Sequence, residues 1–488
     1  MSLYLFNSLT QKKEIFKPLK KGEVKIYVCG PTVYGRIHIG NARTFLFFDI
    51  LKRYLKWCGF KVIYVSNITD VGHLTDEKED KIMKGAAEAG LPVKVFIEEH
   101  IKNYLADLDY LNIERPDIMP RASEHIKEII ETVKTLLKKG YAYEIEELPG
   151  SKSVYFDISK FKSYGKLSRQ RLSQLINKTR EPPNEKKRNP GDFALWIAAE
   201  KTYPLVWKSP WGFGFPGWHI ECSTMSGKYL GIPFDIHGGG IDLIFPHHEN
   251  EIAQAEAATG KKFVNYWIHC EHLLVNMKKM SKSLGNIYTL EDIISRGYNP
   301  LALRFLVLSS HYQSKLNFTW KSLEAASNSL ENIYEFLEKL LQLAPTKLTE
   351  KLPPKSTDLE TKVKETKKRI KEAMNDNLST PEVLSALFEL MDFTTSLLSK
   401  KLVDISSVYQ LFLDVDQFLG LRFKETIEEE LAEEILELIK KREEFRLAKN
   451  FRDADRIRNR LKEMGIEIED TPYGPIWKRT KRIPIWER

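Results

Sequence analysis

The stretch Val24–Asn41 reads VKIYVCGPTVYGRIHIGN and decides the fold. It opens on a short run rich in β-forming residues, Val24–Cys29, which a Gly-Pro pair ends. Helical periodicity follows in Thr44–Trp57, and Lys61–Val65 reads as a second strand. A strand, a helix and a strand at this spacing form a βαβ unit and predict a parallel sheet. We therefore expect an α/β fold.

Beyond this unit the chain divides into regions that differ in composition and in predicted secondary structure. We read about 141–203 as an insertion into the α/β domain, because short β-like runs there surround Glu181–Asp192, a loop dense in Pro, Asn and charge. Sheet-like runs return at Phe234–His237 and Tyr266–Val275, and the chain turns strongly helical after about Pro300. The helices expected from periodicity are Lys78–Ala106, Glu124–Lys139, Pro246–Gly260, Leu323–Leu343, Ser356–Met374, Leu387–Leu397 and Glu428–Lys449.

Composition bounds the class of protein. Of the 488 residues, 42% are hydrophobic and 29% are charged, which is ordinary for a soluble protein of several domains and excludes a largely disordered chain. No apolar stretch approaches the roughly 18 residues of a membrane span, and the N-terminus lacks the features of a secretory signal. The four cysteines are too scattered for a disulfide framework. We expect a cytoplasmic protein without a membrane partner, whose special cysteines are metal ligands or reactive thiols.

The net charge of +8 is mild for this length, but basic residues outnumber acidic ones in the C-terminal segment 441–488. A basic C-terminal module favours a polyanionic partner such as nucleic acid. The alternative is a solvated helix face rich in Lys and Arg, and charge alone leaves both interpretations open.

Two motifs suit the binding of phosphate. The loop Pro31–Asn41 enters a helix, whose first N–H groups and positive dipole end attract anions. Gly35 and Gly40 let the backbone pass close to a ligand, and His38 adds a donor. Far downstream, Lys278–Ser283 reads KKMSKS, and lysines interleaved with serines on a loop suit the clamping of a polyphosphate.

Together these motifs resemble the signatures of the class I aminoacyl-tRNA synthetases. His38–Asn41 (HIGN) stands where that family has HIGH, and Lys279–Ser283 matches KMSKS. The resemblance implies a Rossmann-like core that adenylates an amino acid with Mg-ATP and transfers it to the 3′ end of tRNA. Asn41 departs from the histidine that most of the class has, and its amide donates a hydrogen bond without carrying charge. The implied catalytic residues are His38, Asn41, Lys279 and Lys282, and the implied ATP contacts are Thr32, Gly40, Asn41, Gly238, Lys282 and Ser283.

Four residues form a plausible set of zinc ligands. Cys29 ends the first strand, Cys222 lies in WHIECS, and His247 and Glu251 share one helix face because they are four residues apart. Two thiolates, an imidazole and a carboxylate are ligands that Zn²⁺ accepts. Taken singly, each residue also has an ordinary interpretation: a buried strand cysteine, a helix-capping histidine or a surface acid.

The resemblance narrows to the cysteinyl-tRNA synthetase family. It implies that one Zn²⁺ per chain, held by Cys29, Cys222, His247 and Glu251, binds the thiolate of the substrate cysteine. Such an ion separates cysteine from serine, which an apolar pocket discriminates poorly, and makes an editing domain unnecessary. The matching segments are Tyr27–Tyr34, Asn41–Phe45, Lys187–Asp192, Gly217–Ser223, Phe234–Gly240, Phe245–Gln254 and Lys279–Asn286.

Further residues are expected around the substrate. Trp218 closes over the bound cysteine in this interpretation, although it could also be a core aromatic residue. Thr69, Asp70, Asp235 and His237 are candidates for holding the ammonium, the carboxylate or the ribose.

The C-terminal half is expected to contact tRNA. Residues 301–425 resemble the helical domain that class I enzymes lay along the tRNA stem, and 426–488 is expected to bind the anticodon. Basic side chains contact phosphates and aromatic ones stack on unpaired bases. The candidate base readers are Arg446, Phe451, Asp455 and Asp470, and their ordinary interpretation is an amphipathic helix and hairpin.

The implied reaction joins L-cysteine to tRNA(Cys) at the expense of ATP, with Mg²⁺ accompanying the nucleotide, and we expect a monomer. Two other interpretations stay open: a ligase that joins cysteine to a small amino-sugar, and a non-catalytic RNA-binding protein. The expected domains are a Rossmann-like catalytic domain in two halves, 1–140 and 204–300, the connective insertion 141–203, the helical stem-contact domain 301–425 and the anticodon-binding module 426–488.

Overall fold

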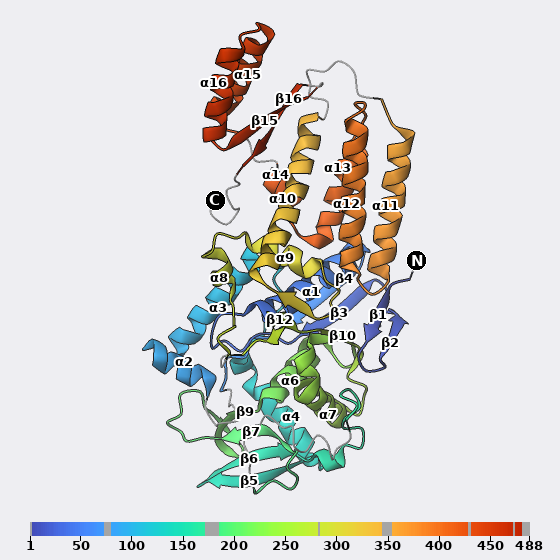
Figure 1. Ribbon diagram of the computed structural model, residues 1–488. Helices are drawn as coiled ribbons and strands as arrows, with labels where there is room; N and C mark the ends of the chain where they lie inside the picture. Colours follow the sequence, from blue (N-terminus) through green and yellow to red (C-terminus); the bar gives the residue numbers. More distant parts are fainter. Residues whose placement is uncertain are drawn as a thin grey trace.

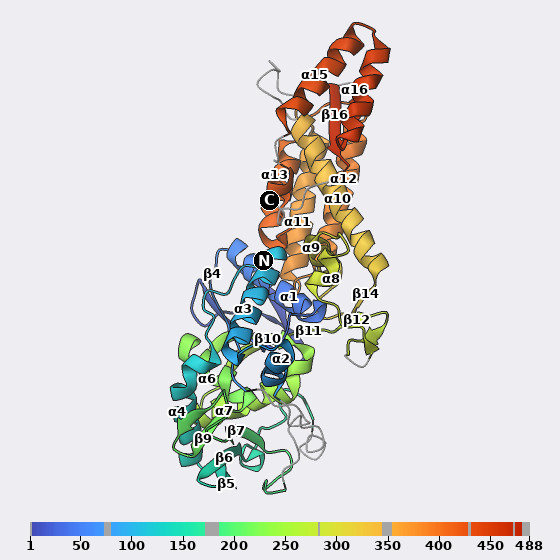
Figure 2. The same ribbon diagram turned by 90° about the vertical axis from the view of Figure 1, so that its left-hand side faces the viewer.

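The fold is seen in a computed structural model of the chain, which describes residues 2–72, 80–170, 185–281, 284–343, 354–427, 431–471 and 474–480. The molecule is elongated (Figure 1). An antiparallel sheet lies at one end, a parallel sheet with its helices follows, and a bundle of long helices leads to a small module at the other end. Figure 2 shows the same order from the side.

The parallel sheet has the strand order β11-β10-β3-β4, and every neighbouring pair in it is parallel. The βαβ unit expected from the sequence is confirmed: β3 (Glu23–Val28) and β4 (Lys61–Ser66) flank α1 (Ile39–Trp57). The helix begins at Ile39, earlier than the periodicity indicated, because His38 caps its first turn. The remaining strands are β10 (Phe234–Gly240) and β11 (Val264–Cys270).

One expected helix is two. The periodicity over Lys78–Ala106 predicted a single helix, but the structure has α2 (Lys81–Ala89) and α3 (Val93–Tyr110). Gly90 ends α2 in the left-handed conformation at φ 66°, and Pro92 precedes α3. Glycine and proline therefore override an apolar spacing that continues through both helices.

The insertion is a five-stranded antiparallel sheet of order β5-β6-β7-β9-β8. It extends to Pro216, past the boundary at 203, because its last strand, β9, pairs with β7 on one side and with β8 on the other. Gly and Trp residues interrupt the alternation of apolar and polar residues in β8 and β9, so the sequence did not predict these strands. The strands are β5 (Ala142–Leu148), β6 (Ser151–Phe156), β7 (Phe193–Ala198), β8 (Trp207–Ser209) and β9 (Gly212–Pro216), and α4 (Ile126–Lys138) precedes them.

The second half of the parallel-sheet domain supplies two helices and a small sheet. Helices α6 (Trp218–Leu230) and α7 (Glu249–Thr259) alternate with the strands of the parallel sheet. The sheet-like run Tyr266–Val275 is divided between β11 and β12 (Leu273–Val275). Strand β12 lies between β13 (Lys278–Lys279) and β14 (Leu316–Phe318).

The rest of the chain is mainly helical. The C-terminal hairpin docks on α10 (Trp320–Leu343), where the Gln342 amide donates to Trp477 O and accepts from Trp477 N, both at 2.8 Å. The other helices are α8 (Leu290–Ile294), α9 (Pro300–Leu308), α11 (Thr357–Asn375), α12 (Thr380–Leu398), α13 (Ser406–Leu419), α14 (Phe423–Ile427), α15 (Glu433–Leu447) and α16 (Phe451–Glu463). The other strands are β1 (Tyr4–Asn7), β2 (Lys12–Ile15), β15 (Ile466–Thr471) and β16 (Gly474–Arg479).

Among the residues that the structure describes, no helix combines the length and the apolar character that a membrane crossing requires.

Candidate active site

A cleft of about 1470 Å³ opens at the carboxyl edge of the parallel sheet. The residues that follow or end three strands line it: Cys29 after β3, Gly240 on β10 and Cys270 on β11. The carboxyl edge is where parallel α/β sheets bind their ligands. The insertion supplies another wall, with Tyr155 and Lys186.

The loops that leave β3 and β4 run side by side, and the first of them lines this cleft. Gly30 N donates to Asn67 Oδ1 at 2.9 Å, and Thr32 and Thr69 form an isolated parallel bridge. A Cβ atom on Gly30 would lie 1.7 Å from Asn67 O, so only glycine allows the two loops to approach this closely. Thr32 lines the cleft, as an ATP contact would.

His38 sits at the N-terminus of α1 with one ring nitrogen engaged. Its Nδ1 accepts a hydrogen bond from Asn41 N at 3.1 Å. Burial lowers the pKa of His38, which favours the neutral ring. Since a neutral imidazole with an accepting Nδ1 carries its proton on Nε2, His38 is a hydrogen-bond donor in the cleft.

The two signature segments meet. A Cβ atom on Gly40 would lie 2.4 Å from Met280 Cε, so the methionine of the second segment packs on the glycine of the first. Asn286 braces the second segment, because it accepts from Ser281 N at 2.9 Å and donates to Lys279 O at 3.2 Å. His38, Asn41 and Lys279 line the cleft, whereas Lys282 and Ser283 lie outside the described residues.

The four expected metal ligands converge from three parts of the sequence. One ligand atom each from Cys29, Cys222, His247 and Glu251 lies within 4.8 Å of all the others, and all four residues are buried. Cys29 follows β3, Cys222 lies in α6, His247 lies in the turn before α7, and Glu251 lies in the first turn of α7. His247 Nε2 is 3.1 Å from Glu251 Oε1, and its Nδ1 is 2.8 Å from His219 Nδ1.

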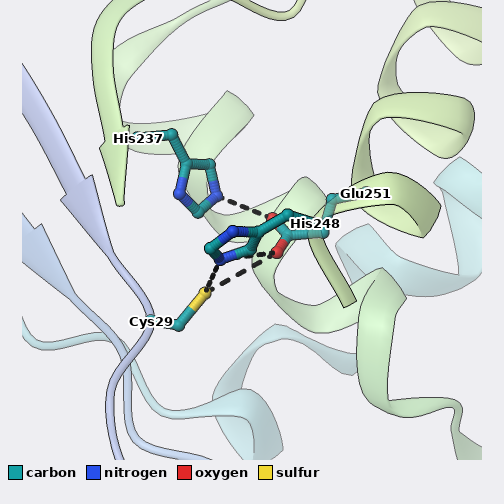
Figure 3. Close-up of side chains that lie close together, drawn as sticks. All are labelled: Cys29, His237, His248 and Glu251. Carbon is teal, nitrogen blue, oxygen red and sulfur yellow. Dashed lines mark hydrogen bonds and ion pairs between the residues drawn. The ribbon is translucent and has the colours of Figure 1, made fainter. Parts of the chain in front are cut away.

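A second group overlaps the first and was not expected. Cys29 and Glu251 also lie within 4.8 Å of His237 and His248 (Figure 3). The sulfur of Cys29 is 3.4 Å from His248 Nε2, and His237 Nε2 is 2.8 Å from Glu251 Oε2. The pair His247-His248 was the only signal for this second group in the sequence, and it does not say which ring faces the cysteines.

The chemistry of these donors fits a soft divalent cation. Burial raises the pKa of the Cys29 and Cys222 thiols and lowers the pKa of His248. The thiols therefore need a nearby positive charge to ionise in this environment, and a metal ion supplies that charge. Thiolate and imidazole ligands together favour zinc over the hard cations Mg²⁺ and Ca²⁺.

Trp218 lies between the cleft and the candidate ligands. It lines the cleft as the first residue of α6, and its ring centroid is 4.3 Å from that of His247. This placement fits the expected contact with an amino-acid side chain that approaches the ligand group.

Asp235 and His237 do not face the cleft. Asp235 lies near the amino end of β10 and accepts hydrogen bonds from Leu19 N at 2.6 Å and Lys25 N at 2.8 Å. This position is at the edge of the sheet opposite to the one where parallel α/β sheets bind ligands, and the expected contact of Asp235 with substrate stays a prediction. The ring of His237 is fully buried and contacts Glu251, a candidate metal ligand, and its expected contact with substrate also stays a prediction.

Thr69 and Asp70 are also engaged within the protein. The Thr69 hydroxyl donates to Glu221 Oε2 at 2.8 Å, and Asp70 accepts from the Ser123 backbone and hydroxyl at 2.8 and 2.6 Å. Both residues are buried, and neither lines the cleft. No role was predicted from the sequence for Glu221, which is next to Cys222. A single acidic residue within a helix is usually a surface residue, so the sequence gives no signal for its burial.

The glycines of β10 have separate roles. A Cβ atom on Gly238 would lie 2.1 Å from Phe48 Cζ, so this glycine lets α1 pack on the sheet. Gly238 is not among the residues that line the cleft, and its expected contact with ATP stays a prediction, whereas Gly240 lines the cleft.

The C-terminal module has its own small core of Leu438, Leu461, Ile466 and Ile468. Two of the expected base readers are bonded to each other: Arg446 Nη1 donates to Asp470 Oδ2 at 2.7 Å. Arg442 also donates to that carboxylate, and this contact is the main cause that lowers the pKa of Asp470. Phe451 and Asp455 lie exposed on α16.

The comparisons with known proteins agree with this geometry. Residues 15–328 match the model of the tRNA synthetases class I (C) catalytic domain. The chain is 44% identical to the cysteine–tRNA ligase of Thermococcus gammatolerans, over 99% of this chain and 100% of that protein. It is also 44% identical to the cysteine–tRNA ligase of Caldicellulosiruptor saccharolyticus, over 98% of this chain and 100% of that protein.

Solved structures of low sequence identity share the fold. Methionyl-tRNA synthetase of Mycobacterium tuberculosis with methionyl-adenylate matches with a TM-score of 0.58 at 13% identity, over 82% of this chain and 90% of that one. The LeuRS–tRNA–LeuAMS ternary complex of Agrobacterium radiobacter matches with a TM-score of 0.59 at 12% identity, over 84% of this chain and 85% of that one. With a catalytic-domain match across most of the parallel-sheet region and relatives aligned end to end, the chain belongs to the cysteine–tRNA ligase family of the class I tRNA synthetases.

Proposed function

We propose that this protein activates L-cysteine with Mg-ATP, releasing pyrophosphate, and transfers the cysteinyl group from the adenylate to the 3′ end of tRNA(Cys). The observation that carries the proposal is the convergence of Cys29, Cys222, His247 and Glu251 at the edge of the cleft that also holds both signature segments. A site for a soft ion next to a phosphate site suits an enzyme that adenylates a thiol-bearing amino acid.

Zinc is the ion that this donor set suits best. The same four residues would hold it, with His237 supporting Glu251 and His219 supporting His247. When bound, the ion would favour the ionised thiol of the substrate and prefer sulfur to oxygen. Trp218 packs beside His247 and would cover the side chain of cysteine.

The two signature segments would orient ATP and stabilise the negative charge of its phosphates. His38 would donate its Nε2 proton to a phosphate oxygen while α1 holds the ring through Asn41 N. Lys279, together with Lys282, would stabilise the charge that develops on pyrophosphate as the cysteine carboxylate attacks the α-phosphorus. The carboxylate needs no base, because it is already ionised at neutral pH.

Recognition of tRNA would be shared between the ends of the molecule. The insertion wall of the cleft carries Lys186 and Lys187, which suit the phosphates of the acceptor end. The exposed Phe451 and Asp455 on α16 suit bases of the anticodon. A monomer stays the expected oligomeric state.

The two alternatives have less support. A cysteine ligase for a small amino-sugar has no need for the C-terminal module, and the relatives align through it over their whole length. A non-catalytic RNA-binding protein has no need for a buried cluster of four ligand-type residues beside a phosphate loop.

The test is aminoacylation with purified components. The protein is incubated with ATP, Mg²⁺, tRNA(Cys) transcript and either labelled cysteine or labelled serine, and acid-precipitable label is counted. The proposal predicts label from cysteine and none above background from serine. Failure to charge tRNA(Cys) with cysteine, or equal charging with serine, would contradict it.

A further inference from the structure

Arg43 is a buried cation whose partners are all backbone carbonyls. It lies on α1 shortly after His38 and Asn41, and it is 1% exposed. Its Nη1 donates to Glu271 O at 2.8 Å and His272 O at 2.6 Å, and its Nη2 donates to His311 O at 3.3 Å and Ser314 O at 2.5 Å. No carboxylate partner of Arg43 is found in the part of the chain that the structure describes.

The four carbonyls lie just before the first residues of two neighbouring strands. Glu271 and His272 directly precede β12, and His311 and Ser314 precede β14. The two strands are paired in parallel, with Leu273 opposite Leu316. The guanidinium therefore holds both strands of one small sheet at the same end.

The same sheet carries the second signature segment. Strand β13 pairs with β12, with Lys279 opposite Leu274 and Lys278 opposite Val275. Continuous backbone hydrogen bonding thus connects the carbonyls that Arg43 binds to the lysine at the start of the segment. At the far end of the segment, Ile39 N donates to Tyr288 O at 2.8 Å, which returns the chain to the first turn of α1.

We propose that Arg43 is a positioning residue for adenylate formation: it fixes the sheet that carries Lys279 against the helix that carries His38. The inference rests on the proposed function. A planar guanidinium suits this role because its fixed fork of donors binds several carbonyls at defined angles, which an ammonium does not. If the sheet moved, the buried guanidinium of Arg43 would lose its hydrogen-bond acceptors. Because an unpaired buried charge is costly, we expect the sheet to stay in place.

The test compares two buried arginines in cysteine-dependent ATP–pyrophosphate exchange. The control is Arg304, on α9, which is also buried. It donates to the carbonyls of Leu111, Asn112 and Leu419 and, unlike Arg43, to a carboxylate, that of Asp49. Arg43→Lys should lower kcat for exchange about a hundredfold, since misplaced reacting groups cost about that much. The KM for cysteine and the zinc content should stay within about twofold of the unchanged protein. Arg304→Lys should lower the melting temperature while kcat stays within about twofold.

Three results would overturn the inference: an Arg43→Lys protein with unchanged kcat, a loss of zinc and cysteine affinity in parallel with kcat, or an equal loss of kcat in Arg304→Lys. Absence of exchange in the unchanged protein would instead contradict the proposed function. If Arg43→Lys does not fold, the inference is tested by amide hydrogen exchange of the unchanged protein, which compares the protection of β12 with that of α1. Amides of β12 should then be protected within about tenfold of those in α1 after Arg43, and protection more than a thousandfold weaker would overturn the inference.

Discussion

His38 shows how a single residue divides its two ring nitrogens between structure and chemistry. Nδ1 caps α1 by accepting from Asn41 N, and Nε2 is left as the donor. The lowered pKa of His38 favours the neutral ring, so the phosphate contact that we propose for it is a directed hydrogen bond rather than a full charge. Capping and catalysis are therefore separable by substitution.

Two substitutions of His38 should have opposite effects. Asn places an acceptor near the position of Nδ1, whereas Gln reaches toward the position of Nε2 with a donor. We expect His38→Asn to keep the stability of the protein and lower kcat for pyrophosphate exchange by about 10²-fold, the usual cost of one lost donor. His38→Gln should keep more of kcat and lose about 1 kcal/mol of stability with the cap. Urea unfolding and exchange kinetics measure the two quantities, and the reverse ranking would contradict the assignment of the nitrogens.

Cys222 and Cys58 form a contrasting pair of cysteines. Cys222 is buried among the candidate metal ligands, whereas Cys58 is an exposed thiol at the end of α1. Cys222→Ser should raise the KM for cysteine by roughly a hundredfold or more and lower the zinc content, because even support residues of metal ligands carry tenfold to hundredfold effects. The KM for ATP should hardly change. Cys58→Ser should leave both KM values unchanged, and a Cys222→Ser protein that behaves in the same way would refute the proposed ligand.

At the scale of elements, Arg304 joins helices of two domains. Its Nη2 donates to Asp49 Oδ2 on α1 at 2.6 Å, and its Nε donates to Leu419 O at the end of α13 at 2.6 Å. Both side chains of the ion pair are fully buried. The parallel-sheet domain and the helical domain are thereby fixed to each other through a charge that cannot be left unpaired.

Arg304→Ala should therefore destabilise the protein strongly. Removal of one partner from a buried ion pair costs about 3–5 kcal/mol. Of its ion pairs among the described residues, the buried Asp49 carboxylate would keep only that with Arg53, whose Nε donates to Oδ2 at 2.8 Å. The control is Arg115→Ala, which breaks the pair with Asp109 whose side chains are 53% and 56% exposed and should cost less than about 1 kcal/mol. Urea unfolding of both variants measures the difference, and equal costs would contradict the role assigned to Arg304.

The sequence predicted those elements whose signals are local. The run before Cys29 and the periodicity after it predicted the βαβ unit, and the two signatures predicted the cleft. The division at Gly90 and Pro92 was missed because the apolar spacing of α2 continues in α3. Asp235 and His237 were candidates for holding the substrate, but which end of a strand borders the cleft depends on the direction of the whole sheet. The four candidate ligands came from the family resemblance, since residues so far apart in sequence meet only through tertiary packing.

At the scale of the whole molecule, the parallel sheet and the C-terminal helices α15 and α16 lie at different places along a long axis (Figure 2). The cleft belongs to the parallel sheet and the insertion, whereas α15 and α16 stand beyond the helical bundle. Gln342 and the buried pair of Glu338 with Arg479, 3.1 Å apart, tie the module to α10. In the proposed function, the contacts of this module with tRNA would therefore lie away from the cleft.

Phe451 tests this separation. Its side chain is 59% exposed on α16, and stacking on a base contributes about 1–3 kcal/mol. Phe451→Ala should raise the KM for tRNA about tenfold or more and leave cysteine-dependent pyrophosphate exchange unchanged. Val95→Ala, which removes an apolar side chain that is 48% exposed on α3, should change neither quantity. An unchanged KM for tRNA in Phe451→Ala would remove this residue from the proposed interface.

X-ray absorption spectra at the zinc edge test whether the thiolate of the substrate binds zinc. They are recorded from the zinc-loaded protein without amino acid, with cysteine and with serine. We expect zinc to have two sulfur neighbours at about 2.3 Å, the thiolates of Cys29 and Cys222, to gain a third on addition of cysteine, and to show no change on addition of serine. A sulfur shell that cysteine does not alter, or a protein that binds no zinc, would contradict this expectation.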